Sequence, residues 1–269
     1  MSNPAINQMN EVFRVFSASE GVIRPHFILT GPSGSGKSFN VLQMCEQHNL
    51  NFIEVNAAQL TKEGLSGNSL SKALAPLGNF GNRPVVCFID EFDKLFISGN
   101  NNCDLAHEST NGVQNELLKC LESRTTSVFG DYGKYREINV ENVLFVFAGA
   151  FNGEEDIDID RLREMGMKTE LLGRVGIVFN LERLTLDTLQ QLLENSPLLQ
   201  NYLDIYEADK GKAIETIMTA LKESYENNTL GARLINTLLH QYFLNGGSLP
   251  EKVSKKASFQ RKLQMTPQR

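Results

Sequence analysis

The feature that most constrains the fold is a glycine-rich segment at residues 31–38, GPSGSGKS. Residues 26–30 (HFILT) before it are mostly apolar, as in a buried strand, and residues 39–45 (FNVLQMC) can continue as a helix. Strand, glycine-rich turn and helix form the context of a phosphate-binding P-loop. Glycines let the backbone curl with its N–H groups pointing inward, and the positive end of the helix also attracts anions. The sequence therefore predicts a nucleoside-triphosphate site.

Each polar side chain at the end of this segment has a predicted role. Lys37 can reach the β- and γ-phosphates, and the Ser38 hydroxyl can hold Mg²⁺. An ordinary glycine-rich loop is the alternative, which the flanking strand and helix disfavour. The predicted cofactors are therefore ATP and Mg²⁺. The predicted nucleotide contacts are Gly31, Pro32, Ser33, Gly34, Ser35, Gly36, Lys37, Ser38 and Phe39.

A second stretch, residues 84–91 (PVVCFIDE), is a continuous apolar run that ends in two acids, 53 residues after Lys37. Such a run is typical of a parallel strand buried on both faces, and its tip is expected beside the P-loop. Asp90 can accept hydrogen bonds from the waters around Mg²⁺, and Glu91 can polarise an attacking water. Helix capping is the alternative role for these acids. With the P-loop upstream, the pair favours ATP hydrolysis over a kinase reaction.

Strand-like and helix-like segments alternate through the first two thirds of the chain. This order predicts an α/β domain with a doubly wound parallel sheet over residues 1–181. We expect strands at 26–30, 51–56, 84–91, 141–150 and 175–180, helices at 4–20, 68–77, 111–122 and 159–165, an irregular segment at 98–108, and a loop or hairpin at 123–140.

The pattern changes after residue 182. Residues 184–193, 212–225 and 230–244 all show helical periodicity, and no strand-like run follows. We therefore expect a small all-helical domain at 182–250 and a basic, flexible tail at 251–269. Thr229 is the expected N-cap of the last helix.

Composition limits the kinds of protein that this chain can be. Hydrophobic residues make up 41% and charged residues 22%, as in ordinary globular proteins. No run of about 18 apolar residues predicts a membrane span, and residues 1–4 (MSNP) do not resemble a signal peptide. The cysteines are scattered with no CxxC pair, which disfavours a metal site or disulfide framework and favours a cytoplasmic protein. They are Cys45, Cys87, Cys103 and Cys120.

The net charge of −6 argues against a protein that coats nucleic acid. Residues 252–269 carry six basic residues and no acid, so the rest of the chain carries −12. A solvated tail is the favoured interpretation of this basic segment, and contact with an anionic partner is the alternative.

Five motifs resemble those of AAA+ ATPases, and within that superfamily those of the ClpX/HslU protein-unfoldase branch. The resemblance runs in order from about residue 27 to 240, most of the chain. The motifs are residues 86–95 (VCFIDEFDKL, a Walker B strand with the trailing Asp-Lys), 112–119 (GVQNELLK, similar to GVQQALLK), 143–151 (VLFVFAGAF, similar to ILFI…GAF), 170–175 (ELLGRV, similar to EFIGRLP) and 231–233 (GAR, similar to sensor 2).

The resemblance implies roles for single residues. Arg174 corresponds to an arginine finger that acts on the neighbouring subunit's nucleotide, which implies a homo-oligomeric, hexameric ring. Arg233 corresponds to the sensor-2 arginine of the lid and is expected to contact the phosphates. Leu65 stands where the branch carries a substrate-gripping aromatic of the pore, with an ordinary exposed leucine as the alternative. Residues 98–108 and Lys134–Arg136 correspond to a second pore loop and a basic loop at the pore entrance.

The chain also departs from that branch. No cysteine cluster precedes the P-loop, so the zinc-binding N-terminal domain is lacking, and the long intermediate domain of HslU is lacking too. About nine residues separate Phe151 from Asp160, too few for the peptidase-docking excursion. No adenine-contacting motif precedes the first strand, so Val22 and Ile23 are the expected adenine contacts by position alone. Residues 148–150 (AGA) lack the polar sensor-1 side chain.

The resulting hypothesis is an ATP-driven ring that remodels, unfolds or threads a protein client or adaptor without a ClpP-type protease. One alternative is an AAA+ loader or translocase that acts on nucleic acid or on a replication helicase, which the acidic body disfavours. Another is a nucleotide-gated assembly scaffold with slow turnover, which the missing polar sensor-1 residue would permit.

Overall fold

The computed structural model describes residues 4–61, 68–96, 104–130 and 133–249. The chain divides into two units, Met1–Arg183 and Leu184–Arg269, and we describe each unit by itself.

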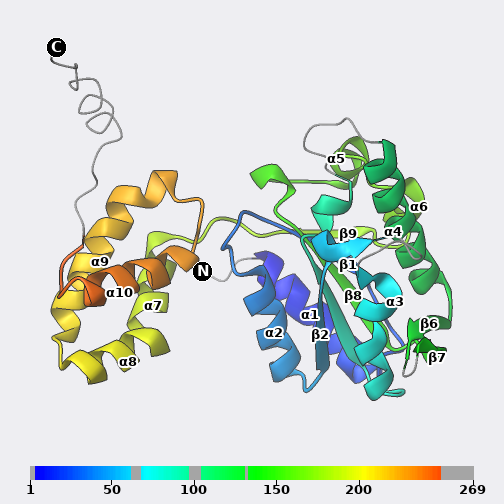
Figure 1. The fold of residues 1–269 in the computed structure, drawn as a ribbon, viewed down its shortest axis with the longest axis horizontal. Helices are drawn as coiled ribbons and strands as arrows, with labels where there is room; N and C mark the ends of the chain where they lie inside the picture. The colour runs from blue at the N-terminus through cyan, green and yellow to red at the C-terminus, as the bar shows by residue number, and fades with distance from the viewer. Residues whose placement is uncertain (1–3, 62–67, 97–103, 131–132, 250–269) are drawn as a thin grey trace, which may run out of the picture. The chain divides into compact units, whose positions relative to one another are not determined.

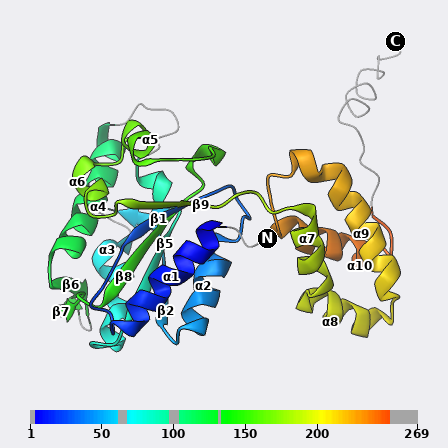
Figure 2. The same ribbon diagram turned by 180° about the vertical axis from the view of Figure 1, so that it is seen from behind.

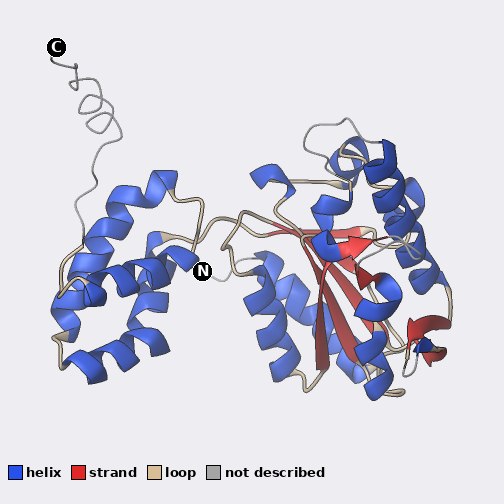
Figure 3. Ribbon diagram, viewed as in Figure 1, coloured by secondary structure: helices blue, strands red, loops and turns tan. Residues whose placement is uncertain are grey.

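The first unit is built on a five-stranded sheet in which every neighbouring pair is parallel (Figures 1 and 3). The strand order is β2-β5-β8-β1-β9. The doubly wound α/β fold expected from the alternating pattern is therefore confirmed. The strands are β1 (Phe27–Thr30), β2 (Asn51–Asn56), β5 (Val85–Asp90), β8 (Val143–Ala148) and β9 (Ile177–Asn180).

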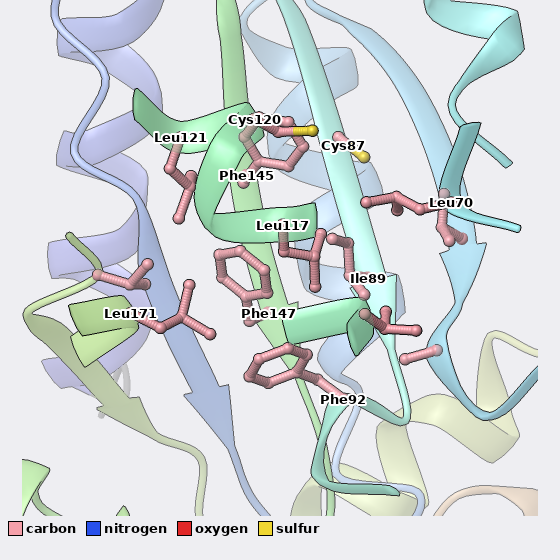
Figure 4. Packing of buried hydrophobic residues seen from close by; sticks show 14 of the residues in the cluster. Leu70, Cys87, Ile89, Phe92, Leu117, Cys120, Leu121, Phe145, Phe147 and Leu171 are labelled. Atoms are coloured by element: carbon pink, nitrogen blue, oxygen red, sulfur yellow. The ribbon is translucent and has the colours of Figure 1, made fainter. Parts of the chain in front are cut away.

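Helices cover both faces of this sheet, because successive residues of each buried strand point to opposite sides. Phe27, Val86 and Phe88 pack with helices α1 and α2, whereas Ile28, Cys87 and Phe147 pack on the opposite face. Figure 2 shows α1 and α2 together on one face, and Figure 4 shows the cluster around α4 on the other. The helices are α1 (Pro4–Ala18), α2 (Lys37–Gln47), α3 (Leu70–Ala73), α4 (Asp104–Glu122), α5 (Ile159–Glu164) and α6 (Thr169–Leu172).

Several short strands and 3-10 helices lie in the segments that connect these strands and helices. Strands β6 and β7 form an antiparallel hairpin within the segment expected as a loop or hairpin. The elements are η1 (Ala57–Gln59), β3 (Leu60–Thr61), β4 (Asn68–Ser69), η2 (Ala75–Asn79), η3 (Phe92–Leu95), β6 (Thr125–Phe129), β7 (Tyr135–Asn139) and η5 (Phe151–Gly153).

Two expectations for this unit were wrong. The helix expected at 68–77 is one α turn, α3, followed by 3-10 helix η2, because Pro76 has no N–H to continue the α-helical ladder. The segment 98–108, expected to be irregular, contributes the start of α4 at Asp104. Packing of Val113, Leu117 and other apolar side chains of α4 outweighs the low helix propensity of its asparagine and threonine residues.

The second unit contains only helices among its described residues. They are α7 (Leu186–Glu194), α8 (Pro197–Tyr206), α9 (Lys210–Ser224), η6 (Tyr225–Asn227) and α10 (Arg233–Leu244). Leucines and aromatic residues such as Leu193, Leu203 and Tyr242 form its separate core. Side-chain oxygens of Thr185, Ser196 and Asp209 cap the first three helices.

The helical unit differs from the sequence-based expectation at two places. Helix α8 was not predicted, although Ser196 as N-cap followed by Pro197 is a recognisable helix start. Thr229 does not cap α10, whose N-cap position is Ala232 with no side-chain bond. Instead, Asn228 Oδ1 accepts hydrogen bonds from the N–H groups of Leu230 and Gly231 and shapes the preceding turn.

Two further observations bear on the class of protein. In the part of the chain that the structure describes, no helix is long and apolar enough to cross a membrane. Cys45, Cys87 and Cys120 are buried free thiols, and burial raises the pKa of Cys45 to about 12. Buried neutral thiols of this kind act as small core residues.

Candidate nucleotide site

The loop between β1 and α2 adopts a backbone that glycine alone adopts easily. Gly34 and Gly36 have φ values of 74° and 86°, and Gly36 occupies the N-cap position of α2. Gly31 has φ 143°, and a Cβ there would lie 2.5 Å from the carbonyl oxygen of Leu181. Glycine is needed at 34 and 36 for conformation and at 31 also for space.

Polar groups line this loop in a way that fits a phosphate chain. Lys37 Nζ donates hydrogen bonds to the carbonyl oxygens of Gly31, at 2.7 Å, and Pro32, at 3.0 Å, so the ammonium group lies across the loop. Ser35 Oγ is buried and has no hydrogen-bond partner among the described residues. A phosphate oxygen is the kind of group that would satisfy it, because a buried hydroxyl without a partner is costly. The residues present therefore fit bound ATP.

The two acids stand at the same edge of the sheet as this loop. Strand β8 lies between β1 and β5, and all three run in parallel, so the tips of β1 and β5 are about two strand spacings, roughly 10 Å, apart. Asp90 is the last residue of β5, and its Oδ1 accepts the backbone N–H of Glu91 at 2.8 Å. Glu91 is exposed and has φ 54°, an uncommon left-handed conformation for a non-glycine residue.

The electrostatic environment of this edge is acidic. Burial raises the pKa of Glu54 on the neighbouring strand β2, and the charge of Asp90 raises it further. Crowded carboxylates repel one another and attract a cation. Asp90, at the tip of β5, is the carboxylate of this pair that stands at the end of the sheet.

Asn180, at the end of β9, is a site-forming residue that the sequence reasoning missed. Its Oδ1 accepts hydrogen bonds from Thr30 Oγ1, at 2.5 Å, and from the N–H of Ile157, at 2.9 Å. Its Nδ2 donates to the carbonyl oxygen of Ile157 at 3.0 Å. The Asn180 side chain thus connects three segments: its own strand β9, the end of β1, where the P-loop begins, and the segment before α5. An amide residue at the carboxyl end of a predicted parallel strand was the available signal.

Comparison with known proteins matches residues 27–171 to the family model described as ATPase family associated with various cellular activities (AAA). The chain belongs to this AAA family. The matched segment runs from the start of β1 through α6 and so includes both the P-loop and the Asp90–Glu91 tip.

Individual relatives support a ClpX-like assignment within AAA+ proteins. The chain is 25% identical over 289 residues to the ATP-dependent Clp protease ATP-binding subunit ClpX of Borrelia duttonii (strain Ly), an alignment that covers 90% of this chain and 67% of the relative. It is 24% identical over 296 residues to the ClpX of Bacteroides fragilis, covering 90% and 70%. The ClpX-like AAA+ resemblance is therefore confirmed, and this AAA protein is an ATPase that uses ATP with Mg²⁺.

The expected adenine contacts of this AAA ATPase are exposed apolar side chains. Val22 is 79% and Ile23 53% exposed, and Phe39, a predicted nucleotide contact, is 61% exposed. Exposure of three large apolar side chains in the same unit as the P-loop is compatible with an apolar ligand face. The roles of Val22 and Ile23 as adenine contacts and of Phe39 as a nucleotide contact stay predictions.

Arg174 lies between α6 and β9 and forms an ion pair within its own chain. Its Nη2 donates to Glu122 Oε1 at 2.8 Å, and the two side chains are 55% and 42% exposed. Exposed ion pairs of this kind contribute little to stability. The guanidinium is therefore held at the surface of the first unit, Met1–Arg183, which we call the AAA unit, by a weak interaction.

The remaining expected site residues lie elsewhere. Arg233 is the first residue of α10, in the helical unit, and its sensor role stays a prediction. Leu65 lies outside the described residues, as do residues 98–103 of the expected second pore loop. In the expected basic loop, Tyr135 is 55% exposed, whereas Arg136 Nη2 donates to the carbonyl oxygen of Ala75 at 3.3 Å.

Proposed function

We propose that this AAA ATPase is a ring motor that uses ATP hydrolysis to remodel, unfold or thread a protein partner. The observation that carries the proposal is the common edge of one parallel sheet at which the glycine loop and the Asp90–Glu91 tip both lie. Similarity to ClpX over 90% of the chain supports a protein, rather than a nucleic acid, as the client.

Within this proposal each site residue has one task. Lys37 binds the β- and γ-phosphates, and Glu91 orients a water and accepts its proton. Ser38 and Asp90 are the residues that would hold Mg²⁺. The metal, when bound, neutralises charge that develops on the phosphate oxygens.

Arg174 and Arg233 each have a role in the proposed ring. Arg174, exposed at the surface of the AAA unit, would reach the nucleotide of a neighbouring subunit. A guanidinium in that position stabilises the transferring phosphoryl group, worth about 10³–10⁵ in rate in well-studied NTPases. Arg233 would couple the helical unit to the state of the nucleotide. Six subunits are proposed by analogy with the ClpX branch.

We propose further that the motor works without a ClpP-type peptidase. After β8, the chain passes through η5 (Phe151–Gly153) and enters α5 at Ile159. These described residues contain no excursion of the kind that docks ClpX onto its peptidase. The remodelled partner would then be released rather than degraded.

The test measures ATP hydrolysis by the purified chain at several protein concentrations, alone, with an unfolded polypeptide, and with single-stranded DNA. We expect specific activity to rise with protein concentration, because sites are shared, and to rise again with the polypeptide. Glu91→Gln should bind ATP but hydrolyse it at least about 100-fold more slowly. Stimulation by DNA alone would contradict a protein client, and unchanged turnover in Glu91→Gln would remove that residue from the mechanism.

A further inference from the structure

A buried carboxylate lies two residues beyond the Walker B acids and has no assigned role. Asp93, in η3, is 1% exposed. Its Oδ2 accepts the backbone N–H of Phe151 at 3.3 Å, and the Lys94 ammonium lies 3.7 Å from the same oxygen. Burial of a carboxylate is costly unless hydrogen bonds compensate it. The contacts of Asp93 therefore suggest a function for this arrangement.

The carboxylate of Asp93 and the ring of Phe151 together explain the glycine at the tip of β8. A Cβ on Gly149 would lie 2.5 Å from Asp93 Oδ1, 3.0 Å from its Cγ and 2.9 Å from Cε2 of Phe151. The backbone of Gly149 is not left-handed, so glycine is needed there for space rather than for conformation. The buried Asp93 carboxylate therefore occupies space that a side chain at position 149 would need.

This arrangement connects the tip of β8 to the residue proposed to activate water. Glu91 is the N-cap of η3, and its carbonyl oxygen accepts the N–H of Lys94 at 3.0 Å. The turn after β8 holds Phe151 and Asn152 in left-handed conformations, with φ of 47° and 58°. Such conformations persist only where surrounding contacts enforce them. The bond from Phe151 N–H to Asp93 is one such contact.

Aromatic packing beneath η3 makes the connection rigid. The ring of Phe92 lies 4.7 Å from that of Phe147 on β8 and 5.4 Å from that of Phe96, which is 6.0 Å from the ring of Phe151 (Figure 4 shows Phe92 and Phe147). These centroid distances are those of favourable aromatic pairs. The apolar contacts fix the position of η3, and Asp93 supplies the directional bond.

We propose that Asp93 is a positioning residue: it locks η3 to the turn after β8 and thereby fixes the direction of Glu91. The inference rests on the proposed role of Glu91 as the residue that activates water.

The first test compares Asp93→Ala with Asp93→Asn, which keeps an oxygen that can accept the Phe151 N–H. We expect Asp93→Ala to lower kcat about tenfold or more while ATP affinity stays within about twofold, because misplacement of Glu91 affects chemistry and not binding. Asp93→Asn should keep kcat within about threefold. Asp160→Asn, the same change at an exposed carboxylate that pairs with Arg163, is the matched control.

A folded Asp93→Ala enzyme with wild-type kcat would overturn the inference, as would equal losses in the alanine and asparagine variants. If Asp93→Ala does not fold, Asp93→Ser takes its place, since its hydroxyl is too short to reach the Phe151 N–H, and full kcat there would overturn the inference equally. Failure of the proposed role of Glu91 can be distinguished from failure of the role of Asp93. If Glu91 does not activate water, Glu91→Gln will retain turnover, irrespective of the results for the Asp93 variants.

A second test uses the packing of Gly149. Gly149→Ala should destabilise the wild-type chain strongly, since the new Cβ meets the Asp93 carboxylate and the Phe151 ring. It should cost less in an Asp93→Ala background, in which only the contact with Phe151 remains. The free energy of unfolding of both single variants and the double variant measures this coupling. Additive costs would show that the two positions do not share space and would contradict the arrangement.

Discussion

At the residue scale, His26 links stability to pH. It is buried just before β1, and its Nδ1 accepts the N–H of Phe145 at 3.1 Å. Burial, and to a smaller extent the charge of Arg24, lowers the pKa of His26 to about 4. The folded chain therefore keeps this imidazole neutral under conditions in which the unfolded chain protonates it.

The sign of the effect follows from this difference. Between pH 6.5 and 4 the unfolded chain binds a proton at His26 that the folded chain does not bind, so protonation favours unfolding. The contribution of His26 to the free energy of unfolding is therefore complete above pH 6.5 and decreases as the pH falls. Between pH 7 and pH 5 the wild-type chain should lose about 2 kcal/mol more free energy of unfolding than His26→Asn, which keeps an acceptor but does not titrate. Urea unfolding at the two pH values measures this. Equal losses in both proteins would refute it.

At the scale of elements, Asn180 holds β9 to its neighbours. The side chain bonds Thr30 at the end of β1 and both backbone groups of Ile157 before α5. Asn180→Ala would leave these partly buried groups unpaired, so we expect a loss of about 2–3 kcal/mol in the free energy of unfolding.

The matched control for this prediction is Asn82→Ala. Asn82 is exposed, and its side chain accepts one bond from Asn139 at 3.3 Å. Its removal should cost no more than about 0.5 kcal/mol. Urea unfolding of the three proteins provides the comparison, and similar stabilities of the Asn180 and Asn82 variants would contradict the role given to Asn180.

At the scale of the whole molecule, Arg174 tests whether subunits share active sites. Its ion pair with Glu122 offers a matched control, since Glu122→Gln removes the negative charge of the pair but leaves the guanidinium in place. We expect Arg174→Ala to lower kcat by about 10³ with little change in ATP affinity. Glu122→Gln should stay within about threefold of wild type, because an exposed ion pair contributes little.

Mixing experiments sharpen this prediction. A ring that contains both Arg174→Ala and Glu91→Gln subunits has some sites with an intact Glu91 and a neighbour's intact Arg174. Such mixtures should hydrolyse ATP faster than either variant alone. Mixtures no faster than the variants, or a Glu122→Gln enzyme as slow as Arg174→Ala, would argue against a shared site and in favour of a local structural role for Arg174.

The sequence by itself determined the features that depend on local patterns. A strand–glycine loop–helix unit, an apolar strand that ends in two acids, and alternating strands and helices are each encoded by neighbouring residues, so the parallel α/β fold and the AAA+ resemblance could be predicted. Start signals such as Ser196-Pro197 also lay in the sequence, although they were missed.

Only the tertiary structure decided the contacts between distant segments. Nothing near Gly149 in the sequence indicates that the carboxylate of Asp93 fills its side-chain space, and nothing near Asn180 indicates bonds to Thr30 and Ile157. Helix α4 likewise begins at Asp104, in a segment whose local propensities favour irregular structure. Patterns in the chain report which face of an element is buried, whereas the partner that meets each buried polar group depends on how strands far apart in sequence come side by side.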